Sequence, residues 1–544
     1  MGNEGEGHSA FLVQGKPVSF ICKHKKIWHI SRIKLLFCVL FLFFSFLGLH
    51  AADADSLSLY GRMRSNGTTA ESGFFSLVYD NPAMKYVWHP STLNELRAGG
   101  EYIHEEQPSL AEEGDGRYMG FVDVRSFIRK GNSSLWGEAR YKNGKKTGRR
   151  WNETSDYLLL YPYVMGDTVG GDLKSEQYYF SGGYAYRKGS YTIGAEGSYG
   201  ADIEYRNADP RPKNLTGDLY FTIGMSWKTG NHYALGYSLH ARKYKQTNDL
   251  QFYNELGVPN IYHFTGLGTD YYRFRGAKGK SFYKGRSFGG SVNLSPFDAG
   301  EGGFAVSLLY DHFSFDKIIS SLNELPMASV GEHDLRGEIA WRSSKDRFSR
   351  WGMKLEAAFT KRTGTENLFG DASGNIYPQI AEDEMYMNRI SRGVLSGFYE
   401  YTYRSGTVFS IIPSIGYTDM NTRYVYPRRE MEIHRLHSQL MLKAMFPCGH
   451  WLLRGELGGR YVASLTPELQ LPAVETEEAK KLNQPVYGNY GYLAANQAGF
   501  QVAMRGDYSR HKAYGLFLEL RYVYGHDTRP SAANSLTASV GVAF

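Results

Sequence analysis

The segment Tyr514–Tyr524, which reads YGLFLELRYVY, decides the fold class. Its side chains alternate between two sets, of which one is wholly apolar (Tyr514, Leu516, Leu518, Leu520, Tyr522 and Tyr524) and the other holds Glu519 and Arg521. A period of two places successive side chains on opposite faces of a β-strand. A strand of about 10 residues with one continuous apolar face is typical of a strand that crosses an outer membrane.

Similar segments recur from residue 94 to the C-terminus, and the connections between them alternate in length. Eight connections are short: Lys130–Gly131, Lys188–Gly189, Thr229–Gly230, Asp298–Gly302, Ser343–Arg347, Ser405–Gly406, Gly449–His450 and Ser509–Lys512. Longer polar connections lie between them, such as 144–175, 244–284, 361–391 and 462–495. Outer-membrane barrels have short periplasmic turns and long extracellular loops, so the pattern predicts an all-β, antiparallel transmembrane barrel of about 18 strands, with 16 and 14 as alternatives.

Aromatic side chains flank seven of the eight short turns on the apolar face, as Trp341 and Trp351 do. Because amphipathic rings settle at the level of lipid headgroups, these pairs predict one aromatic girdle. Cross-strand pairing in an ordinary sheet is the alternative. Pro413 lies inside a strand, where it cannot donate a hydrogen bond, and predicts a β-bulge.

The N-terminal residues predict export. Basic residues up to Lys34 precede the apolar run Leu35–Leu49, and the small residues Ala51 and Ala52 follow. This order is that of a secretory signal peptide, so we expect residues 1–52 to be removed by cleavage near Ala51-Ala52. A retained N-terminal anchor is the alternative. The expected organisation is a signal peptide at 1–52, a short periplasmic or lumen-entering segment at 53–93, and an outer-membrane barrel at 94–544.

Composition excludes several classes of function. Residues 1–52 hold six Lys or Arg and two Asp or Glu, which leaves 56 basic and 53 acidic residues. This small excess does not support a nucleic-acid-binding protein. Cys448 is the cysteine that remains after Cys22 and Cys38 leave, so a disulfide framework within the chain is excluded. No residue pattern points to a cofactor, a metal site or a catalytic group, and we expect that the protein is not an enzyme.

The last strand ends on alternate apolar residues, among them Val540, Val542 and Phe544. A terminal aromatic residue after such an alternation resembles the signal that barrel proteins present to the outer-membrane assembly machinery. The resemblance implies that this machinery and outer-membrane lipid are partners of the chain.

The expected lumen face carries charged residues of both signs: Glu138, Arg140, Arg336, Glu338, Lys354, Glu356, Lys443, Arg454, Glu456, Glu519 and Arg521. If Trp341 opposes Trp351, Glu338 lies opposite Lys354 and Arg336 opposite Glu356. A two-residue turn at Gly449–His450 places Lys443 opposite Glu456. We expect an ion-pair lattice along a wet interior, because a selectivity filter needs charge of one sign.

The segment Tyr157–Val164 is apolar and aromatic inside a long connection. An apolar patch in water is unfavourable, so three arrangements remain: an additional hairpin strand, a loop folded into the lumen, or a docking surface.

The signal sequence, the barrel pattern over 94–544 and the terminal Phe544 together resemble outer-membrane barrels of the Bacteroidota type that have no assigned function. Asn81-Pro82-Ala83 is similar to a motif near the N-terminal hatch of long-chain fatty-acid transporter-like barrels, and this resemblance implies a segment that enters the lumen. A plain turn is the alternative. TonB-dependent receptors fit poorly, since they need a large plug and only about 40 residues lie between the expected cleavage site and residue 94.

Three functions remain open at this point. The first is a channel or transporter for small or amphipathic molecules, which the size and charged lining of the barrel favour. The second is an accessory barrel whose long loops dock a surface-exposed complex, such as a surface lipoprotein or a transporter partner. A membrane-embedded enzyme is the third and least favoured.

Overall fold

The computed structural model describes residues 58–544 except 67–69, 71–73, 76, 88–90, 254–259, 277–278, 299–300, 344–347, 375, 474, 512 and 530. The expected signal peptide lies outside the described residues, as does most of the expected turn at Ser343–Arg347. None of the described helices is long and apolar enough to cross a membrane.

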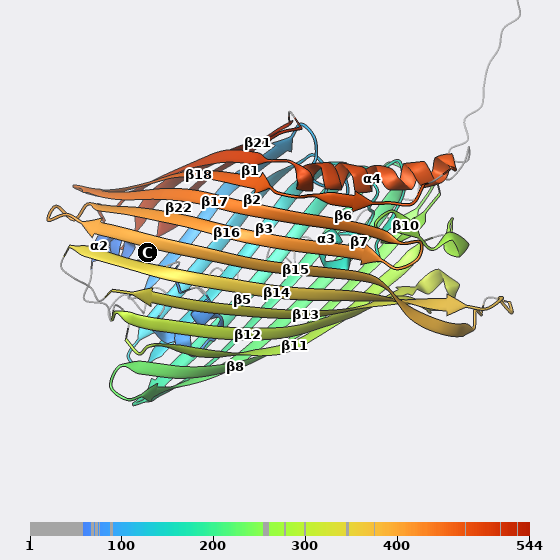
Figure 1. Cartoon of the computed structure of the whole chain (residues 1–544). Coiled ribbons are helices and arrows are strands. Elements are labelled where there is room, and N and C mark those ends of the chain that lie inside the picture. Colours follow the sequence, from blue (N-terminus) through green and yellow to red (C-terminus); the bar gives the residue numbers. More distant parts are fainter. Residues whose placement is uncertain are drawn as a thin grey trace, which may run out of the picture. The chain divides into compact units, whose positions relative to one another are not determined.

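In the described part of the chain, eighteen antiparallel strands form one closed barrel (Figure 1). Neighbouring strands along the barrel pair with each other, and the last strand pairs with the first. The strands are β1 (Leu93–Glu105), β2 (Gly116–Lys130), β3 (Ser133–Arg149), β5 (Gly171–Lys188), β6 (Tyr191–Tyr205), β7 (Arg211–Thr229), β8 (Tyr233–Gln251), β11 (Lys280–Pro296), β12 (Gly303–Ile319), β13 (Leu325–Arg342), β14 (Ser349–Phe369), β15 (Gln379–Thr402), β16 (Val408–Tyr424), β17 (Arg429–Cys448), β18 (Trp451–Ser464), β20 (Gln497–Tyr508), β21 (Gly515–Asp527) and β22 (Ser531–Ala543). The predicted fold class is confirmed.

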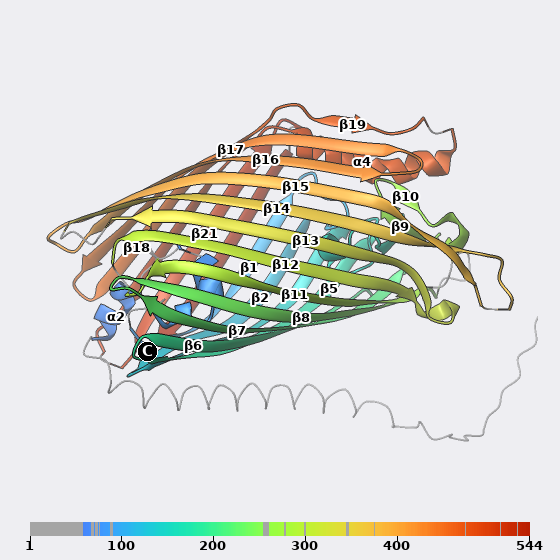
Figure 2. The ribbon, with the colours of Figure 1, turned by 60° about the horizontal axis from the view of Figure 1, so that its bottom comes forward.

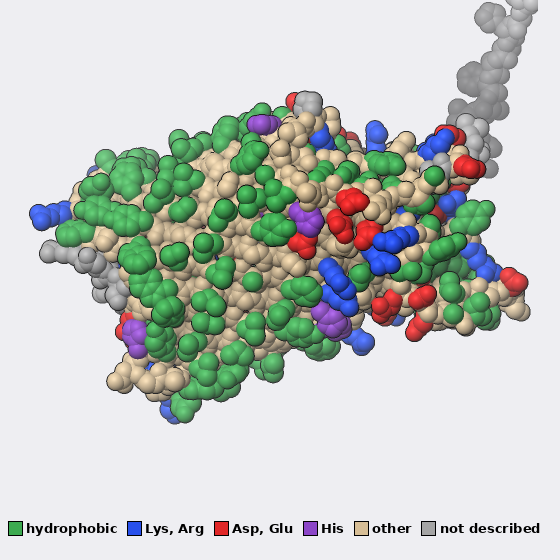
Figure 3. All heavy atoms as spheres, viewed as in Figure 1, with side chains coloured by type: hydrophobic (Ala, Val, Ile, Leu, Met, Phe, Trp, Pro, Cys, Tyr) green, Lys and Arg blue, Asp and Glu red, His purple; other side chains and the backbone are tan. Residues whose placement is uncertain are grey.

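Alternation along each strand separates an outer from an inner face. On β21, Leu516 and Leu518 are each 51% exposed, whereas Phe517 between them is 4% exposed. Figure 3 shows apolar side chains spread over the outer surface toward the short-turn end, and most of the charged side chains in view toward the other end. Exposed rings such as Tyr191 and Trp451 lie beside the short turns. The outer surface therefore has the apolar band and the aromatic residues of a lipid-facing barrel.

The connections alternate as expected, with the short turns at one end of the barrel and the long connections at the other (Figures 1 and 2). The predicted connection 361–391 is mostly strand, because β14 and β15 continue as a paired hairpin to Phe369 and Gln379. Its apolar alternation fades where the hairpin extends beyond its neighbours, and for this reason the sequence pattern resembles a loop.

The β-bulge expected at Pro413 is wrong. The register of β16 with β15 and with β17 is the same on both sides of Pro413. The pairing with β15 is only interrupted at Ile412 and Pro413, so the ladder accommodates the missing N–H without an inserted residue.

Smaller elements lie at the two ends. The short-turn end holds α2 (Leu59–Ser65) and the 3₁₀ turns η2 (Leu77–Asp80) and η3 (Met84–Val87). The long-loop end holds α3 (Tyr157–Leu160), η4 (Tyr272–Phe274), η5 (Ser320–Leu322), α4 (Glu477–Ala494), the strand β19 (Glu468–Gln470), and a small sheet of β4 (Met165–Gly166), β9 (Tyr262–Gly266) and β10 (Thr269–Asp270).

Candidate functional site: a lumen closed at two levels

The described residues of 58–92, here called the N-terminal plug, lie inside the barrel at the short-turn end (Figure 1). Leu59 and Met63 on α2 pack against inward side chains such as Leu452 of β18 and Phe517 of β21. Ser58 caps the helix by accepting a hydrogen bond from the N–H of Gly61 at 3.2 Å. The plug therefore uses apolar side chains of the lumen wall as its seat.

Asn81-Pro82-Ala83 lies in a groove formed by glycines on adjacent strands. A Cβ atom added to Gly194 would lie 2.6 Å from the N atom of Ala83, and one added to Gly224 would overlap the Asn81 side chain. Asn81 is fully buried, its Nδ2 donates to Asn293 Oδ1 at 3.2 Å, and its Oδ1 accepts from the N–H of Ala83 at 3.0 Å. Only strands without side chains at these positions admit the motif.

Charged groups also hold the plug. Lys85 of η3 forms an ion pair with Glu196 of β6. The Arg187 guanidinium lies 4.2 Å from the ring centre of Tyr86 and 4.1 Å from that of Phe297, so one cation joins the plug to the wall.

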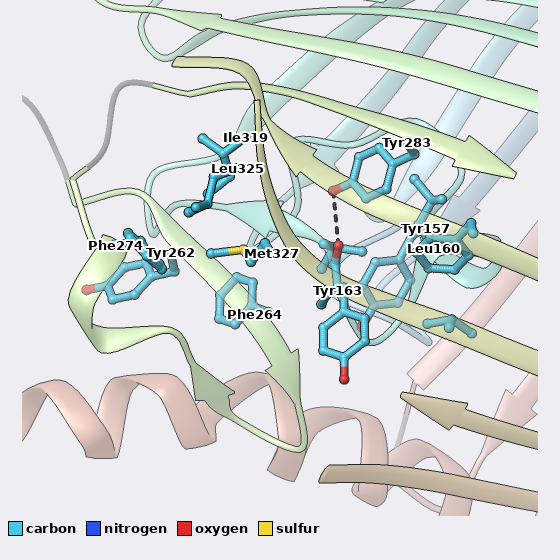
Figure 4. Packing of buried hydrophobic residues seen from close by; sticks show 14 of the residues in the cluster. Tyr157, Leu160, Tyr163, Tyr262, Phe264, Phe274, Tyr283, Ile319, Leu325 and Met327 are labelled. Carbon is cyan, nitrogen blue, oxygen red and sulfur yellow. Dashed lines mark hydrogen bonds between the residues drawn. The ribbon is translucent and has the colours of Figure 1, made fainter. Parts of the chain in front are cut away.

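The long-loop end is closed by a second structure, here called the loop seal, which comprises the described residues of the connections 106–115, 150–170 and 252–279 together with α4. The segment Tyr157–Val164 folds into the lumen and forms a buried apolar cluster with β9 and the wall strands β8 and β11–β14. Figure 4 shows Tyr163 and Leu160 in this cluster, and the Tyr283 hydroxyl donates to the Tyr163 carbonyl at 3.0 Å. Of the three arrangements that the sequence allows, the structure has the loop folded into the lumen.

Glu112 joins three parts of the loop seal. Its carboxylate accepts from the Tyr157 hydroxyl at 2.8 Å and from Asn489 of α4 at 3.1 Å. Burial raises the pKa of this carboxyl above its ordinary value, and the two hydrogen bonds oppose the shift. Next to it, the fully buried Arg149 donates to the Glu112 carbonyl at 2.9 Å and to Glu204 at 3.2 Å.

Thr476 positions α4 by accepting a hydrogen bond from the N–H of Ala479 at 3.3 Å, and Glu477 and Glu478 occupy the first helical turn. The buried α4 residues Leu482 and Val486 pack into two different apolar clusters of the loop seal. The helix therefore covers the mouth of the barrel as part of the loop seal.

Between the plug and the loop seal lies a central cavity of about 810 Å³ with a charged lining. A second, upper cavity of about 560 Å³ lies between the segment 155–159 and the wall strands β3 and β5–β8. Tyr179 of β5 lines both cavities, and the Arg140 guanidinium lies 5.9 Å from its ring centre. The two cavities thus adjoin at Tyr179, whereas aromatic side chains fill another part of the lumen at the long-loop end.

The structure separates the charged residues predicted for the lumen into three groups. Those that line the central cavity are Glu138, Lys443, Arg454, Glu456, Glu519 and Arg521. Arg140 lines the upper cavity and contacts Glu138. Arg336, Glu338, Lys354 and Glu356 lie on β13 and β14, outside the linings of both cavities. There the Lys354 ammonium lies 5.5 Å from the Phe74 ring centre of the plug.

The predicted register between β13 and β14 is wrong. Trp341 faces Met353 rather than Trp351, and Glu338 faces Glu356. The last pair is Arg342 with Gly352, so β14 extends beyond the end of β13 by Ser349–Trp351. The pairing is shifted by two residues, which preserves the faces. Lys354 still reaches Glu338 at 3.8 Å and Glu356 at 3.2 Å, while Arg336 pairs with Asp334 of its own strand.

The register between β17 and β18 is as predicted, since Lys443 faces Glu456 and their charged atoms are 3.3 Å apart. Arg521 reaches the same carboxylate at 3.3 Å. Mixed-sign pairs therefore line this wall of the central cavity.

Several ion pairs beside the barrel closure were not predicted from the sequence. Arg97 of β1 pairs with the buried Asp123 at 2.5 Å, and Arg454 of β18 pairs with the buried Asp507 at 2.5 Å. Arg505 joins Asp507 at 2.8 Å. Arg505 and Asp507 are two residues apart, as the predicted lining residues are, so the same alternation contained the signal.

The Val540, Val542 and Phe544 side chains belong to the closing strand or follow it directly. The N–H of Phe544 donates to the Asn94 carbonyl at 2.9 Å, and the reciprocal bond has the same length. Their role as an assembly signal stays a prediction. Among the described residues, no three His, Cys, Asp or Glu side chains are placed to hold a metal ion.

The fold and the lumen define the class of a closed, plugged β-barrel of the outer-membrane type. Within this class, the chain belongs to the family described as "Family of unknown function (DUF6850)", whose model matches residues 82–544. No curated protein matches the sequence.

Three solved structures illustrate the similarity at the level of the barrel. The ferric preacinetobactin receptor BauA of Acinetobacter baumannii has 9% identity over 84% of this chain and 80% of its own, with a TM-score of 0.37. A mutant of the ferric enterobactin receptor PfeA of Pseudomonas aeruginosa has 7% identity, the same coverages and a TM-score of 0.36. The copper transporter OprC has 9% identity over 81% of this chain and 62% of its own, with a TM-score of 0.39. At these values the likeness carries no inference about cargo.

Proposed function

We propose that this protein is an outer-membrane transporter through which small polar or charged solutes pass, and that the N-terminal plug is its gate. The long loops then face the outside of the cell, and the short turns and the plug face the periplasm. The charged central cavity between two closures is the observation that carries the proposal.

Residence in the outer membrane is supported by the outer surface of the barrel. Side chains such as Leu516, Ile339 and Leu355 are about half exposed and recur at every second position of their strands. A band of this kind around a protein in water would be unfavourable, whereas lipid covers it without penalty. Export, cleavage after the signal peptide and delivery by the barrel assembly machinery belong to the same proposal.

Passage of solutes is supported by the lining of the cavities. Charged side chains such as Arg97, Arg454 and Glu456 line this cavity and favour hydration of it. Such a polar lining suits small hydrophilic solutes better than long acyl chains. A barrel that served only as a scaffold would need no charged cavity of about 810 Å³.

The plug is a better gate than the loop seal because of how it is held. Glycines line the groove that holds Asn81-Pro82-Ala83. The charged contacts of Lys85 and Arg187 are partly exposed to lumen water. Such contacts exchange with water at little cost. Withdrawal of the plug toward the periplasm would connect the central cavity to that side.

Conductance in planar bilayers tests this function. The variant Gly194→Ala/Gly224→Ala places methyl groups in the groove and displaces the plug, so it should open frequently where the native chain stays closed. The control Gly337→Ala/Gly393→Ala changes two strand glycines whose new Cβ atoms meet nothing closer than 3.9 Å. Equal conductance of both folded variants would contradict a gating role of the plug.

A second function has one observation of its own. The β14–β15 hairpin extends beyond neighbouring strands at the long-loop end and exposes Leu368, Ile376 and Ile380, the last by 69%. Exposed apolar side chains on such an extension suit docking of a surface-exposed partner. Co-purification from mild detergent with the native chain, and its loss with Ile376→Ser/Ile380→Ser, would support this function. Association that is unchanged in the variant would contradict docking through this hairpin.

A further inference from the structure

The inward face of β17 changes character from one end to the other. Met431 and Ile433 belong to an apolar cluster of the loop seal, and Met445 contacts the plug. Arg435 and His437 lie between these regions, above Lys443 of the central cavity. Along this wall, a basic segment therefore lies between the loop seal and the central cavity.

Two further arginines on neighbouring strands complete a cationic patch, defined here as Arg392, Arg435, His437 and Arg460. Arg392 of β15 and Arg435 of β17 both pair with Thr418 of the strand between them. The Thr418 hydroxyl bonds His437 Nε2 at 3.0 Å. The three arginines all act electrostatically on His437, so their side chains lie in its neighbourhood.

The patch faces the lumen rather than the lipid. Arg392 alternates in phase with the inward Phe398 and Glu400, and Arg460 with the inward Arg454 and Glu456. The Arg392 and Arg460 side chains point inward and are nevertheless exposed, so they are in contact with lumen water.

The patch differs from the rest of the charged lumen because it lacks carboxylates. In the central cavity, Arg97, Arg454 and Lys443 each have a carboxylate oxygen within 4 Å. Within the part of the chain that the structure describes, no ion pair or hydrogen bond involves the side chain of Arg392 or of Arg460, and Arg435 donates only to the carbonyls of Leu493 and Tyr492.

We propose that the cationic patch binds a small oxyanion, with carboxylate or phosphate groups, on its way to the central cavity. This deepens the proposed transport function and rests on it. Guanidinium groups match carboxylate and phosphate oxygens with paired hydrogen bonds, and Arg392 and Arg460 keep their donors free for such a ligand. Like charges held together without a counterion repel each other, and a bound oxyanion removes this repulsion.

Equilibrium binding to the detergent-solubilised full chain tests the proposal, with inorganic phosphate and citrate as separate probes in isothermal titration. The variant Arg392→Gln/Arg460→Gln should weaken binding of the preferred probe by about tenfold or more, since hydrogen bonds to charged groups are among the strongest in proteins. The preferred probe distinguishes phosphate from carboxylate chemistry.

The matched control is Lys361→Gln/Arg389→Gln. It removes two charges from facing positions on the outer face of β14 and β15, and Arg389 is three residues from Arg392. Binding should stay unchanged in the control. Absence of binding of both probes to the native chain, or equal weakening in both folded variants, would overturn the proposal.

A second measurement separates this inference from the transport function. In the plug-opened Gly194→Ala/Gly224→Ala background, the reversal potential in a KCl gradient should show anion preference, and Arg392→Gln/Arg460→Gln should reduce it. An open pore without preference and without probe binding refutes the patch and leaves transport standing. Probe binding in a chain that never conducts refutes transport and leaves the patch standing.

Discussion

At the short-turn end, the lumen is closed by a threaded segment that lies in a glycine-lined groove and is held by an amide, an ion pair and a cation between two rings. At the long-loop end, loops far apart in sequence share one buried aromatic cluster. The plug also buries apolar side chains, among them Phe74 and Phe75. Its charged contacts through Lys85 and Arg187, however, are partly exposed to water and exchange more readily than an apolar cluster opens. We therefore expect the plug to move more readily than the loop seal, in keeping with the gating role proposed for it.

The largest expected effect concerns the side of the membrane that each closure faces, because a cysteine is either labelled by the reagent or protected from it. Cys448 is exposed at the short-turn end, and Glu477 is exposed on α4. In intact cells, an impermeant thiol reagent should label Glu477→Cys on a Cys448→Ser background and leave the native chain unlabelled. Labelling of Cys448 together with protection at position 477 would reverse the assignment of sides.

The stability of the closed loop seal can be tested by substituting two leucines on the short helix α3. Leu160 is fully buried and Leu158 is 64% exposed. Leu160→Ala should destabilise the seal by about 2–5 kcal/mol through lost burial and a new cavity, and Leu158→Ala should have little effect. Hydrogen exchange of residues 150–165 measures both. Equal protection in the two variants would show that the cluster does not hold the seal closed.

A smaller effect is expected at the plug. Asn81→Ala leaves the buried N–H of Ala83 without its acceptor, at a cost of about 1–3 kcal/mol. Exchange of the amides at 77–87 should become faster while the loop seal keeps its protection. The exposed Asn132 in a short turn provides the control Asn132→Ala. If Asn81→Ala loosens both closures equally, they are not independent.

A pH dependence is expected at the loop seal. Burial raises the pKa of Glu112 above its ordinary 4.5, so the closed seal holds a proton that an opened loop gives up in the interval between the two values. Protection of the seal should therefore decrease as the pH rises through that interval. Glu112→Gln should weaken this trend, and the exposed Glu477→Gln should leave it unchanged. A seal that gains protection with rising pH would contradict the sign.

The smallest effect on stability is expected for the ion pairs of the central cavity, which lies between the plug and the loop seal. Lys443 and Glu456 are each about one-fifth exposed to lumen water. Lys443→Ala should change the stability of the barrel by about 1 kcal/mol or less, as measured by urea unfolding. A larger loss would mean that the lattice, and not the two closures, stabilises the lumen.

The sequence by itself determined the barrel, a strand number of about 18 and the face of each predicted lining residue, since all follow from a period of two and from short turns that join adjacent strands. It also determined the register across the two-residue turn at Gly449–His450, because a turn of that length leaves one way to pair Lys443. The sequence did not determine the register between β13 and β14, because a longer connection does not fix how the strands align.

Only the tertiary structure decided how the lumen is filled. Asn81 meets Gly224 and Asn293 across more than a hundred residues of chain, and Tyr163 meets Tyr283 in the same way. Arg392 and Arg460 join one patch because the successive pairings from β15 to β18 bring their strands into alignment. Local alternation records which face a side chain occupies. It does not record which distant segments fold into the enclosed space, because that depends on shape and burial summed over the whole barrel.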